Sequence, residues 1–236
     1  MNSDHGKNVA SMFGRIAGWY DFLNHFLSLG LDILWRKALA GHFGLPPERE
    51  SRLLDLAAGT MDVSLEAVSR HPRLRVTAAD FCLPMLQKGV EKLARRGVAS
   101  IDPVQADGRA LPFADESFHA ASIAFGIRNI RPRQAAYAEL LRVLRPGGRL
   151  CILEFGSGKQ KILGGLYNFY LNTLLPVVGK VFSKDDSAYR YLADTILEFP
   201  DAASLAKEMR DAGFAEVYYE KHTFGIVVIH VGVKGK

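Results

Sequence analysis

The sequence predicts an α/β fold in which a doubly wound, largely parallel sheet carries helices on both faces. From residue 52 onward, short apolar runs alternate with helical patterns, which is the order that builds such a sheet. The first run leads into a glycine-containing turn and then a helix. With 48% hydrophobic residues among 236, the chain can bury a large core, and we assign residues 1–236 to a single domain.

An amphipathic helical pattern precedes the sheet, and we assign residues 9–45 to an N-terminal helical cap. Its apolar side chains recur at three- and four-residue steps, among them Phe13, Ile16, Tyr20 and Leu23. Two interpretations stay open. The helices either pack on the domain, which periodicity alone favours, or cover a ligand cleft.

Residues 50–155 form the predicted cofactor-binding core, with five strands and the helices between them. The strand runs are residues 52–57, 74–79, 101–105, 118–125 and 149–155. The clearest helices span residues 83–96 and 133–144, and a Pro-Gly-Gly turn at 146–148 ends the second one. The carboxyl ends of these strands are expected to meet at one edge of the sheet, where such folds bind ligands.

The last third of the chain divides into an insertion and a closing unit. Residues 156–199 are less regular and rich in aromatic residues, which predicts a lid insertion before the last strands. A helix is expected at 201–212, followed by two strand-like runs at 215–223 and 226–233 that form an antiparallel pair. Residues 200–236 thereby complete a seven-stranded sheet of mixed direction.

The composition limits the classes of partner and compartment. Thirty Lys and Arg against 25 Asp and Glu leave a net charge of +5, which suits anionic ligands or a lipid surface but does not indicate nucleic acid. Cys82 and Cys151 are far apart and show no CxxC spacing, so a reducing, cytoplasmic setting is expected. Residues 1–8 carry no secretory signal pattern. The seven histidines show no metal-ligand spacing, and no metal is predicted.

The insertion contains the stretch that comes closest to a membrane span. Residues 162–179 are uncharged, but Gly164, Gly165 and Pro176 interrupt them, and a spanning helix needs about 20 mainly apolar residues. We therefore reject a transmembrane helix. Lysines flank the apolar residues of the insertion, namely Lys159, Lys161, Lys180 and Lys184. A peripheral contact at the inner face of the membrane and a homodimer interface both stay open, and an internal lid is favoured over membrane contact.

Acidic residues near the ends of successive strands predict a nucleotide-type cofactor site. Asp55 lies in the first strand, ahead of the turn that contains Gly59 and Thr60, and Asp80 ends the second strand 25 positions later. An acid at this spacing binds ribose hydroxyls in doubly wound folds, although Asp80 can also cap the following helix. Asp55 either orders the turn or faces an ammonium group. The turn lacks GxGxxG, which argues against a dinucleotide.

The end of the third strand extends this pattern. Asp107 and Gly108 follow it, and the block LPFADESF at residues 111–118 leads into the fourth strand. This arrangement resembles the class I S-adenosylmethionine-dependent methyltransferases. The resemblance implies a Rossmann-like fold and S-adenosyl-L-methionine as cofactor, with Asp107 facing the adenine amine. The cofactor-binding residues that it implies are Asp55, Gly59, Thr60, Asp80, Asp107 and Gly108.

Further motifs narrow the resemblance. Residues 20–35 read YDFLNHFLSLGLDILW, which is similar to the YDxMN-x-x-LS-x-x-x-H-x-x-W signature of the ubiquinone/menaquinone biosynthesis C-methyltransferase family. The FGIRN segment at 125–129 and the RVLRPGGRL segment at 142–150 match two other motifs of that family. The likeness runs from about residue 9 to 233. Two positions depart from it: Met61 replaces a glycine of DLxxGTGD, and Asp32 replaces a histidine.

This resemblance implies methyl transfer to a ring carbon of a reduced prenylated quinone, as in demethylmenaquinol to menaquinol. Arg128 is the candidate that stabilises a phenolate, Asn129 orients it, and Tyr20 is a hydrogen-bond partner for the quinol. From the residues alone, three structural roles are about equally open: an ion pair for Arg128, a turn cap for Asn129 and cap packing for Tyr20. Asp32 is interpreted as a surface acid, because the proton-transfer role of a histidine is in doubt here.

Other functions stay open as well. An enzyme of the same class can act on the benzoquinol precursor of ubiquinone or on another small molecule. A degenerate member would bind a prenylated quinone or a partner without methyl transfer. Met61 motivates that alternative, since methionine lacks the freedom of glycine at positive φ. A nicotinamide oxidoreductase is the weakest alternative because the glycine pattern is wrong for it.

Overall fold

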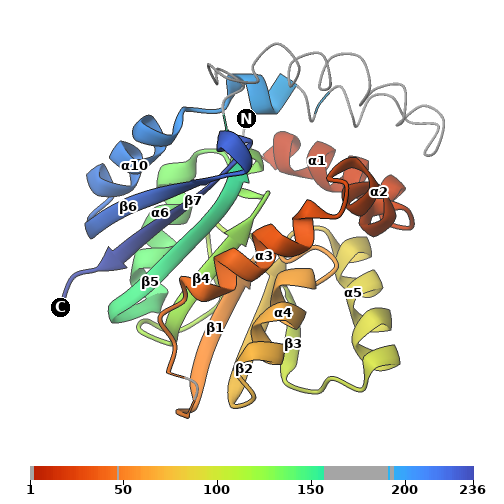
Figure 1. Ribbon diagram of the computed structural model, residues 1–236, viewed down its shortest axis with the longest axis horizontal. Coiled ribbons are helices and arrows are strands. Elements are labelled where there is room, and N and C mark those ends of the chain that lie inside the picture. The colour runs from red at the N-terminus through yellow and green to blue at the C-terminus, as the bar shows by residue number, and fades with distance from the viewer. Residues whose placement is uncertain (1–2, 47, 157–190, 192–193) are drawn as a thin grey trace.

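The computed structural model describes residues 3–46, 48–156, 191 and 194–236, and a central sheet lies between two layers of helices (Figure 1). Within these residues, seven strands are hydrogen-bonded in the order β3-β2-β1-β4-β5-β7-β6. They are β1 (Ser51–Leu56), β2 (Leu74–Asp80), β3 (Ile101–Gln105), β4 (Phe118–Ala124), β5 (Leu144–Phe155), β6 (Phe214–His222) and β7 (Val227–Lys234). Strands β1 to β5 run parallel, and β7 is antiparallel to both of its neighbours. The predicted doubly wound sheet of mixed direction is confirmed.

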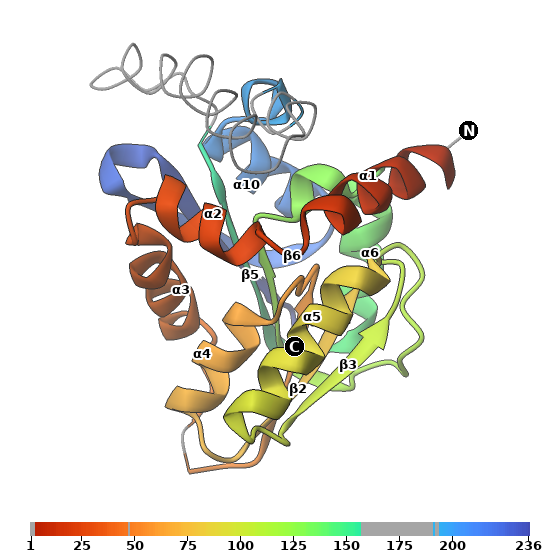
Figure 2. The ribbon, with the colours of Figure 1, turned by 90° about the vertical axis from the view of Figure 1, so that its right-hand side faces the viewer.

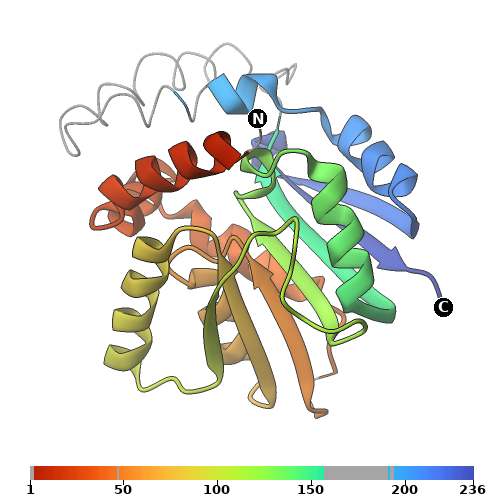
Figure 3. The same cartoon turned by 180° about the vertical axis from the view of Figure 1, so that it is seen from behind.

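Helices cover both faces of the sheet (Figures 1 and 3). One face carries α3 (Leu31–Gly41), α4 (Asp62–Arg70) and α5 (Leu83–Arg96), and the other carries α6 (Arg133–Val143) and α10 (Ala202–Asp211). Leu53 and Leu54 are adjacent in β1, and each is fully buried in a different one of these two layers. Burial on both faces explains the continuous apolar runs, since each buried leucine contributes about 1.5–3 kcal/mol.

Two more helices, α1 (Ser3–Ile16) and α2 (Tyr20–Leu27), precede α3. They lie above the carboxyl ends of the central strands rather than against a face of the sheet (Figures 2 and 3). Met12, Ile16 and Leu23 form a small apolar cluster between them. Helix α1 begins before residue 9, so the helical region at the amino terminus is longer than expected.

Strand β5 begins earlier than the sequence predicts. Leu144 already pairs with Phe118, the chain then leaves the ladder through the Pro-Gly-Gly turn, and pairing resumes between Ala120 and Arg149. Gly147 has φ +74°, a conformation that glycine adopts without a steric penalty. The turn is therefore an irregularity within the strand, and not a separator between helix and strand.

The predicted lid at residues 156–199 lies largely outside the described residues, and so do its lysines and the stretch at 162–179. Tyr191 and the chain from 194 onward are described. In the described part of the chain, none of the helices is long and apolar enough to cross a bilayer.

Candidate active site

A cavity opens at the carboxyl ends of the central strands, under helix α1. This is the edge of the sheet at which doubly wound folds bind ligands. The strand ends and the loops after them contribute Leu56, Ala57, Gly59, Asp80, Asp107, Gly108, Ala124 and Gly126. The amino-terminal helices contribute Gly6, Val9, Ala10, Phe13 and Tyr20. The helices before the sheet thus form one wall of this cavity.

Glycines bring the loops close to this cavity. Gly59 has φ +54° in the turn after β1. A Cβ atom on Gly126 would lie 2.4 Å from Cβ of Ala57, and one on Gly108 would lie 3.0 Å from Cδ2 of Leu56. Side chains at these positions would push the loops apart or fill the space between them. The sequence-predicted Gly59 and Gly108 therefore shape the cavity through their backbone.

Asp80 presents its carboxylate to the cavity at the end of β2. Its Oδ2 accepts a hydrogen bond from the backbone N–H of Gly59 at 2.7 Å, and its Oδ1 accepts one from that of Cys82 at 2.7 Å. Burial raises the pKa of Asp80, and the hydrogen bonds from these amides oppose the rise. Because each carboxylate oxygen can accept a second hydrogen bond, Asp80 can hold the glycine turn and two ligand hydroxyls together.

Asp55 lies beneath the same turn and does not line the cavity. Its Oδ2 accepts a hydrogen bond from Ser64 Oγ at 2.6 Å, and its Oδ1 accepts one from Ser122 Oγ at 2.8 Å. Burial raises the pKa of Asp55 to about 6, against the opposing effect of these hydrogen bonds. Of the two roles open for Asp55, this geometry supports ordering of the turn.

Asp107 lines the cavity together with a partner that sequence reasoning did not single out. The guanidinium of Arg109 donates to both oxygens of Asp107, with Nη2 to Oδ2 at 2.6 Å and Nε to Oδ1 at 3.0 Å. This hydrogen bonding lowers the pKa of Asp107. Nη1 of Arg109 also donates to the carbonyl of Arg131 at 3.0 Å, which fixes the guanidinium. The carboxylate is thereby held ionised and oriented at the cavity wall.

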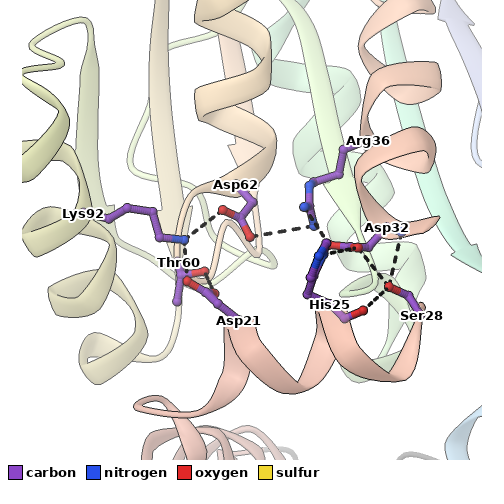
Figure 4. Close-up of polar contacts among 8 residues, drawn as sticks. All are labelled: Asp21, His25, Ser28, Asp32, Arg36, Thr60, Asp62 and Lys92. Carbon is purple, nitrogen blue, oxygen red and sulfur yellow. Dashed lines mark hydrogen bonds and ion pairs between the residues drawn. The ribbon is translucent and has the colours of Figure 1, made fainter. Parts of the chain in front are cut away.

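Thr60 connects the glycine turn to the amino-terminal helices (Figure 4). Its hydroxyl donates to Oδ1 of Asp21 in α2 at 2.5 Å. Lys92 of α5 bridges Asp21 at 2.6 Å and Asp62 of α4 at 2.8 Å. We call Asp21, Thr60, Asp62 and Lys92 the cap junction. It ties α2 to the turn and to both helices beside it.

Asp32 of α3 belongs to a set of polar contacts beside the cap junction (Figure 4). Arg36 contacts Asp32 at 2.7 Å, and His25 and Ser28 reach its Oδ1 at 3.0 and 2.9 Å. Burial acts to raise the pKa of Asp32, but Arg36 and the hydrogen bonds together lower it. The interpretation of Asp32 as a surface acid is wrong, because the residue is buried and ion-paired.

Tyr20 and Asn129 also line the cavity, and a buried ion pair is formed by the residue next to Asn129. Burial raises the pKa of Tyr20, although a hydrogen bond with Asn24 and the charge of Arg128 oppose the rise. Asn129 Oδ1 accepts a hydrogen bond from the hydroxyl of Tyr191 at 3.0 Å. Arg128, in the short helix η1 (Ile127–Asn129), makes an ion pair with Glu154 of β5. We call Tyr20, Asn129, Tyr191, Arg128 and Glu154 the polar end of the cavity.

The Arg128–Glu154 pair keeps unused hydrogen-bonding atoms. Among the described residues, neither Nε of Arg128 nor Oε2 of Glu154 has a hydrogen-bond partner, and both atoms are buried. The guanidinium also lies over the ring of Phe155, 5.6 Å from its centroid. Arg128 does not line the cavity itself, whereas its neighbour Asn129 does. The cation therefore lies one residue away from the cavity wall and does not form it.

The chain matches the model of the ubiE/COQ5 methyltransferase family over residues 1–234. It is 40% identical over 234 residues to the ubiquinone/menaquinone biosynthesis C-methyltransferase UbiE of Geotalea daltonii, with 98% of both chains covered. It is 41% identical to the UbiE protein of Pseudomonas putida, with 98% of this chain and 91% of that one covered. The chain belongs to the ubiE/COQ5 methyltransferase family. It is a UbiE-type, S-adenosylmethionine-dependent C-methyltransferase of ubiquinone/menaquinone biosynthesis.

A solved structure with the same fold is a possible histamine N-methyltransferase from Thermotoga maritima. It has a TM-score of 0.64 and 18% identity, and the match covers 96% of this chain and 99% of that one. Phosphoethanolamine N-methyltransferase 2 of Haemonchus contortus, in complex with S-adenosyl-L-methionine, also reaches 0.64 at 15% identity, over 85% and 52% of the two chains. At these identities the likeness shows the fold alone, which is that of the class I methyltransferases.

Met61, which replaces a glycine of the family motif, leaves the cavity open. The residue adopts the positive φ of +69° itself, and its side chain is fully buried away from the residues that line the cavity. Gly89 of α5 provides the room, since a Cβ there would lie 2.8 Å from Sδ and Cε of Met61. The feature that motivated a member without methyl transfer therefore does not obstruct the site.

The structure brings most of the predicted site residues to one cavity. Gly59, Asp80, Asp107, Gly108, Asn129 and Tyr20 line it, while Asp55, Thr60 and Arg128 lie just behind its wall. Asn129 bonds to Tyr191 in the structure, where the sequence predicted that it orients Arg128. Sequence reasoning missed Arg109, Glu154 and Lys92. Only Arg109 carried a usable signal, as a cation two positions from Asp107.

Proposed function

We propose that this UbiE-type enzyme methylates the ring of demethylmenaquinol to give menaquinol. The observation that carries the proposal is that one cavity is lined by two groups of different chemistry. The first group, the cofactor end, has glycine loops and oriented carboxylates, and the second, the polar end, has Tyr20 and Asn129 with the buried Arg128–Glu154 pair next to Asn129. The first group suits a nucleoside with an amino-acid arm, and the second suits a phenol.

The cofactor end fits S-adenosyl-L-methionine, which when bound supplies an electrophilic methyl group on a sulfonium. We assign the ribose hydroxyls to Asp80, whose two oxygens are already oriented by backbone amides. We assign the adenine amine to Asp107, held ionised by Arg109. Close approach at Gly126 depends on its missing Cβ atom, Gly59 adopts a positive φ that glycine tolerates, and Thr60 orders the turn through Asp21.

The polar end is assigned to the hydroquinone oxygen. A phenolic hydroxyl has an ordinary pKa near 10, so its proton must be lost or shared before the neighbouring ring carbon becomes nucleophilic. The phenol of Tyr20 stays protonated because burial raises its pKa, and it can donate a hydrogen bond to that oxygen. The cation of Arg128, which is buried between Glu154 and the ring of Phe155, stabilises the negative charge that develops there.

The charge of Glu154 determines how strongly Arg128 can stabilise a phenolate. Its carboxylate is fully buried, and burial raises its pKa against the opposing charge of Arg128. An ionised Glu154 offsets part of the positive charge but also holds the guanidinium in place. Arg128 Nε, which has no partner among the described residues, is the donor that remains for Asn129 or for the substrate side of the cavity.

The proposal is tested with the purified protein, S-adenosyl-L-methionine and one of two chemically reduced acceptors carrying the same short prenyl chain. One acceptor is demethylmenaquinol, and the other is the demethylated benzoquinol precursor of ubiquinone. Mass spectrometry of the extracted quinones reports the added methyl group. We expect methylation of demethylmenaquinol. Methylation of the benzoquinol alone would replace the substrate in the proposal, and methylation of neither ring would overturn it.

A further inference from the structure

A second cluster of ligating side chains lies outside the cavity, where α3 ends near the edge strand β6. His42 follows the last residue of α3, and Glu220 and His222 stand two positions apart in β6. One ligand atom from each of the three lies within 4.8 Å of the others. None of them lines the cavity. We call these three residues the seam cluster.

The distances within the seam cluster are close to those of a metal site. Nε2 of His42 lies 3.5 Å from Oε2 of Glu220, and Nε2 of His222 lies 3.9 Å from the same oxygen. Ligands of a tetrahedral zinc ion at about 2.0–2.1 Å are separated by roughly 3.3–3.5 Å. A small inward movement of the side chains would therefore bring all three atoms to bonding distance.

One ligand atom of the cluster has no other role in the fold. Nε2 of His222 is buried and has no hydrogen-bond partner among the described residues. Because this nitrogen has no hydrogen bond to give up in the part of the chain that the structure describes, it is free to ligate an ion. The histidine and carboxylate side chains remain partly accessible, with relative exposures of 17% for His42, 53% for Glu220 and 28% for His222. The cluster is thus open to solvent mainly at Glu220.

The backbone around the cluster is fixed without a metal. The carbonyl of His42 accepts hydrogen bonds from Nη1 of Arg149 at 3.2 Å and from Sγ of Cys151 at 3.5 Å. Next to His222, the hydroxyl of Thr223 accepts a hydrogen bond from Nε1 of Trp35 at 2.8 Å. The backbone next to His42 and next to His222 is therefore held in place by other contacts. This lowers the entropic cost of bringing the three ligands together.

We propose that His42, Glu220 and His222 bind one divalent transition-metal ion of the zinc class. Two imidazoles and a carboxylate are a ligand set that suits zinc and related ions, with the remaining position open to water. The ion links α3 to β6 across about 180 residues of sequence, and α3 continues into the cap junction through Asp32 and Arg36. The ion stabilises the contact between α3 and β6, and it lies apart from the methyl-transfer site.

The experiment uses the full chain, freed of metal by a chelator and then dialysed. Zinc is titrated calorimetrically, and cobalt is titrated while its visible absorption is recorded, since the band reports nitrogen and oxygen ligation. We expect one equivalent of either ion to bind and the thermal midpoint to rise by roughly 5–10 °C at a concentration 100-fold above the Kd.

Variants decide whether the seam cluster is the site. His222→Ala and Glu220→Gln should each weaken zinc binding by roughly 10–100-fold or more, since even outer-shell changes have effects of that size. His71→Ala is the matched control, because His71 also has a buried nitrogen, Nδ1, without a partner in the described part of the chain. That variant should bind like the wild type. If His222→Ala does not fold, Glu220→Gln, whose side chain is half exposed, carries the test.

The proposal is overturned if no saturable binding occurs at micromolar zinc. It is equally overturned if folded Glu220→Gln binds as tightly as the wild type, because the ion then sits elsewhere. Neither readout involves methyl transfer, so the result is independent of the substrate.

Discussion

The cofactor end and the polar end of the cavity differ in how many of their buried polar atoms already have a hydrogen-bond partner within the protein. At the cofactor end, Asp55 and Asp80 each accept hydrogen bonds on both oxygens from the protein itself. At the polar end, Arg128 and Glu154 each keep a buried atom without a partner among the described residues. The cofactor end is thus built before the ligand arrives. The polar end keeps uncommitted groups, as expected where charge appears only during the reaction.

The largest expected effect comes from removing the cation at the polar end. Arg128→Ala should slow turnover of the quinol by roughly 10²–10³-fold, because the developing phenolate loses its stabilising charge. The Kd for S-adenosylmethionine, measured by calorimetry, should stay within about twofold of the wild-type value, since Arg128 does not line the cavity.

Loss of Arg128 also leaves Glu154 buried and unpaired, which costs roughly 3–5 kcal/mol. The double variant Arg128→Met/Glu154→Gln removes both charges and is the control for folding. It should fold with near wild-type stability and remain slow. Wild-type turnover in either variant would remove Arg128 from the mechanism.

The pH dependence of stability tests the carboxylate beneath the glycine turn. The pKa of Asp55 is raised to about 6, above the ordinary value of 3.8, so the folded state binds more protons than the unfolded state between pH 4 and 6. The contribution of Asp55 to the free energy of unfolding should therefore fall by about 3 kcal/mol as pH rises through this window. Denaturant unfolding at several pH values measures this fall.

Asp55→Asn should remove this contribution, because an amide does not titrate in the window. Asp102→Asn, at an exposed position of β3, is the matched control and should keep the wild-type profile. Identical profiles for Asp55→Asn and the wild type would show that Asp55 ionises normally in the fold.

The third effect concerns Asp80, the acid to which we assign the ribose hydroxyls of the cofactor. Asp80→Asn keeps the size of the side chain, but an amide has one oxygen where Asp80 uses two to accept from Gly59 and Cys82. We expect the affinity for S-adenosylhomocysteine to fall by roughly 10–100-fold, which is the range for a charged hydrogen bond. Calorimetric titration measures this, with Asp102→Asn again as the control. An unchanged Kd would contradict the assignment of the ribose to Asp80.

The smallest effect is expected at the cap junction. Asp21→Asn keeps an acceptor for the hydroxyl of Thr60 but removes the charge that faces Lys92. Because Asp21 is partly exposed and Lys92 keeps Asp62, cofactor affinity should fall only by about twofold to fivefold. Glu91→Gln, which removes a solvent-exposed pair with Lys88, serves as the control. If Asp21→Asn lowers cofactor affinity more than Asp80→Asn does, the cap junction contributes more to cofactor binding than Asp80.

Much of the fold was predictable from local patterns. Helix α5 and strand β3 have the bounds that periodicity indicates, because their apolar residues and turn signals are local. The start of β5 was not predictable, since Leu144 pairs with Phe118 only through contacts that cross the Pro-Gly-Gly turn. Residues 157–190 of the predicted lid lie outside the described part of the chain, so their role stays a prediction.

The amino-acid sequence by itself determined the parallel sheet, the edge at which Asp80 and Asp107 meet, and the motifs of the family. These follow from the period of apolar residues and from the rule that parallel strands end at one edge. Only the tertiary structure decided which carboxylate faces the cavity, that Gly89 makes room for Met61, and that His42 meets His222. The physical reason is that burial and pairing depend on contacts between segments far apart in the chain, and spacing along the sequence does not encode such contacts.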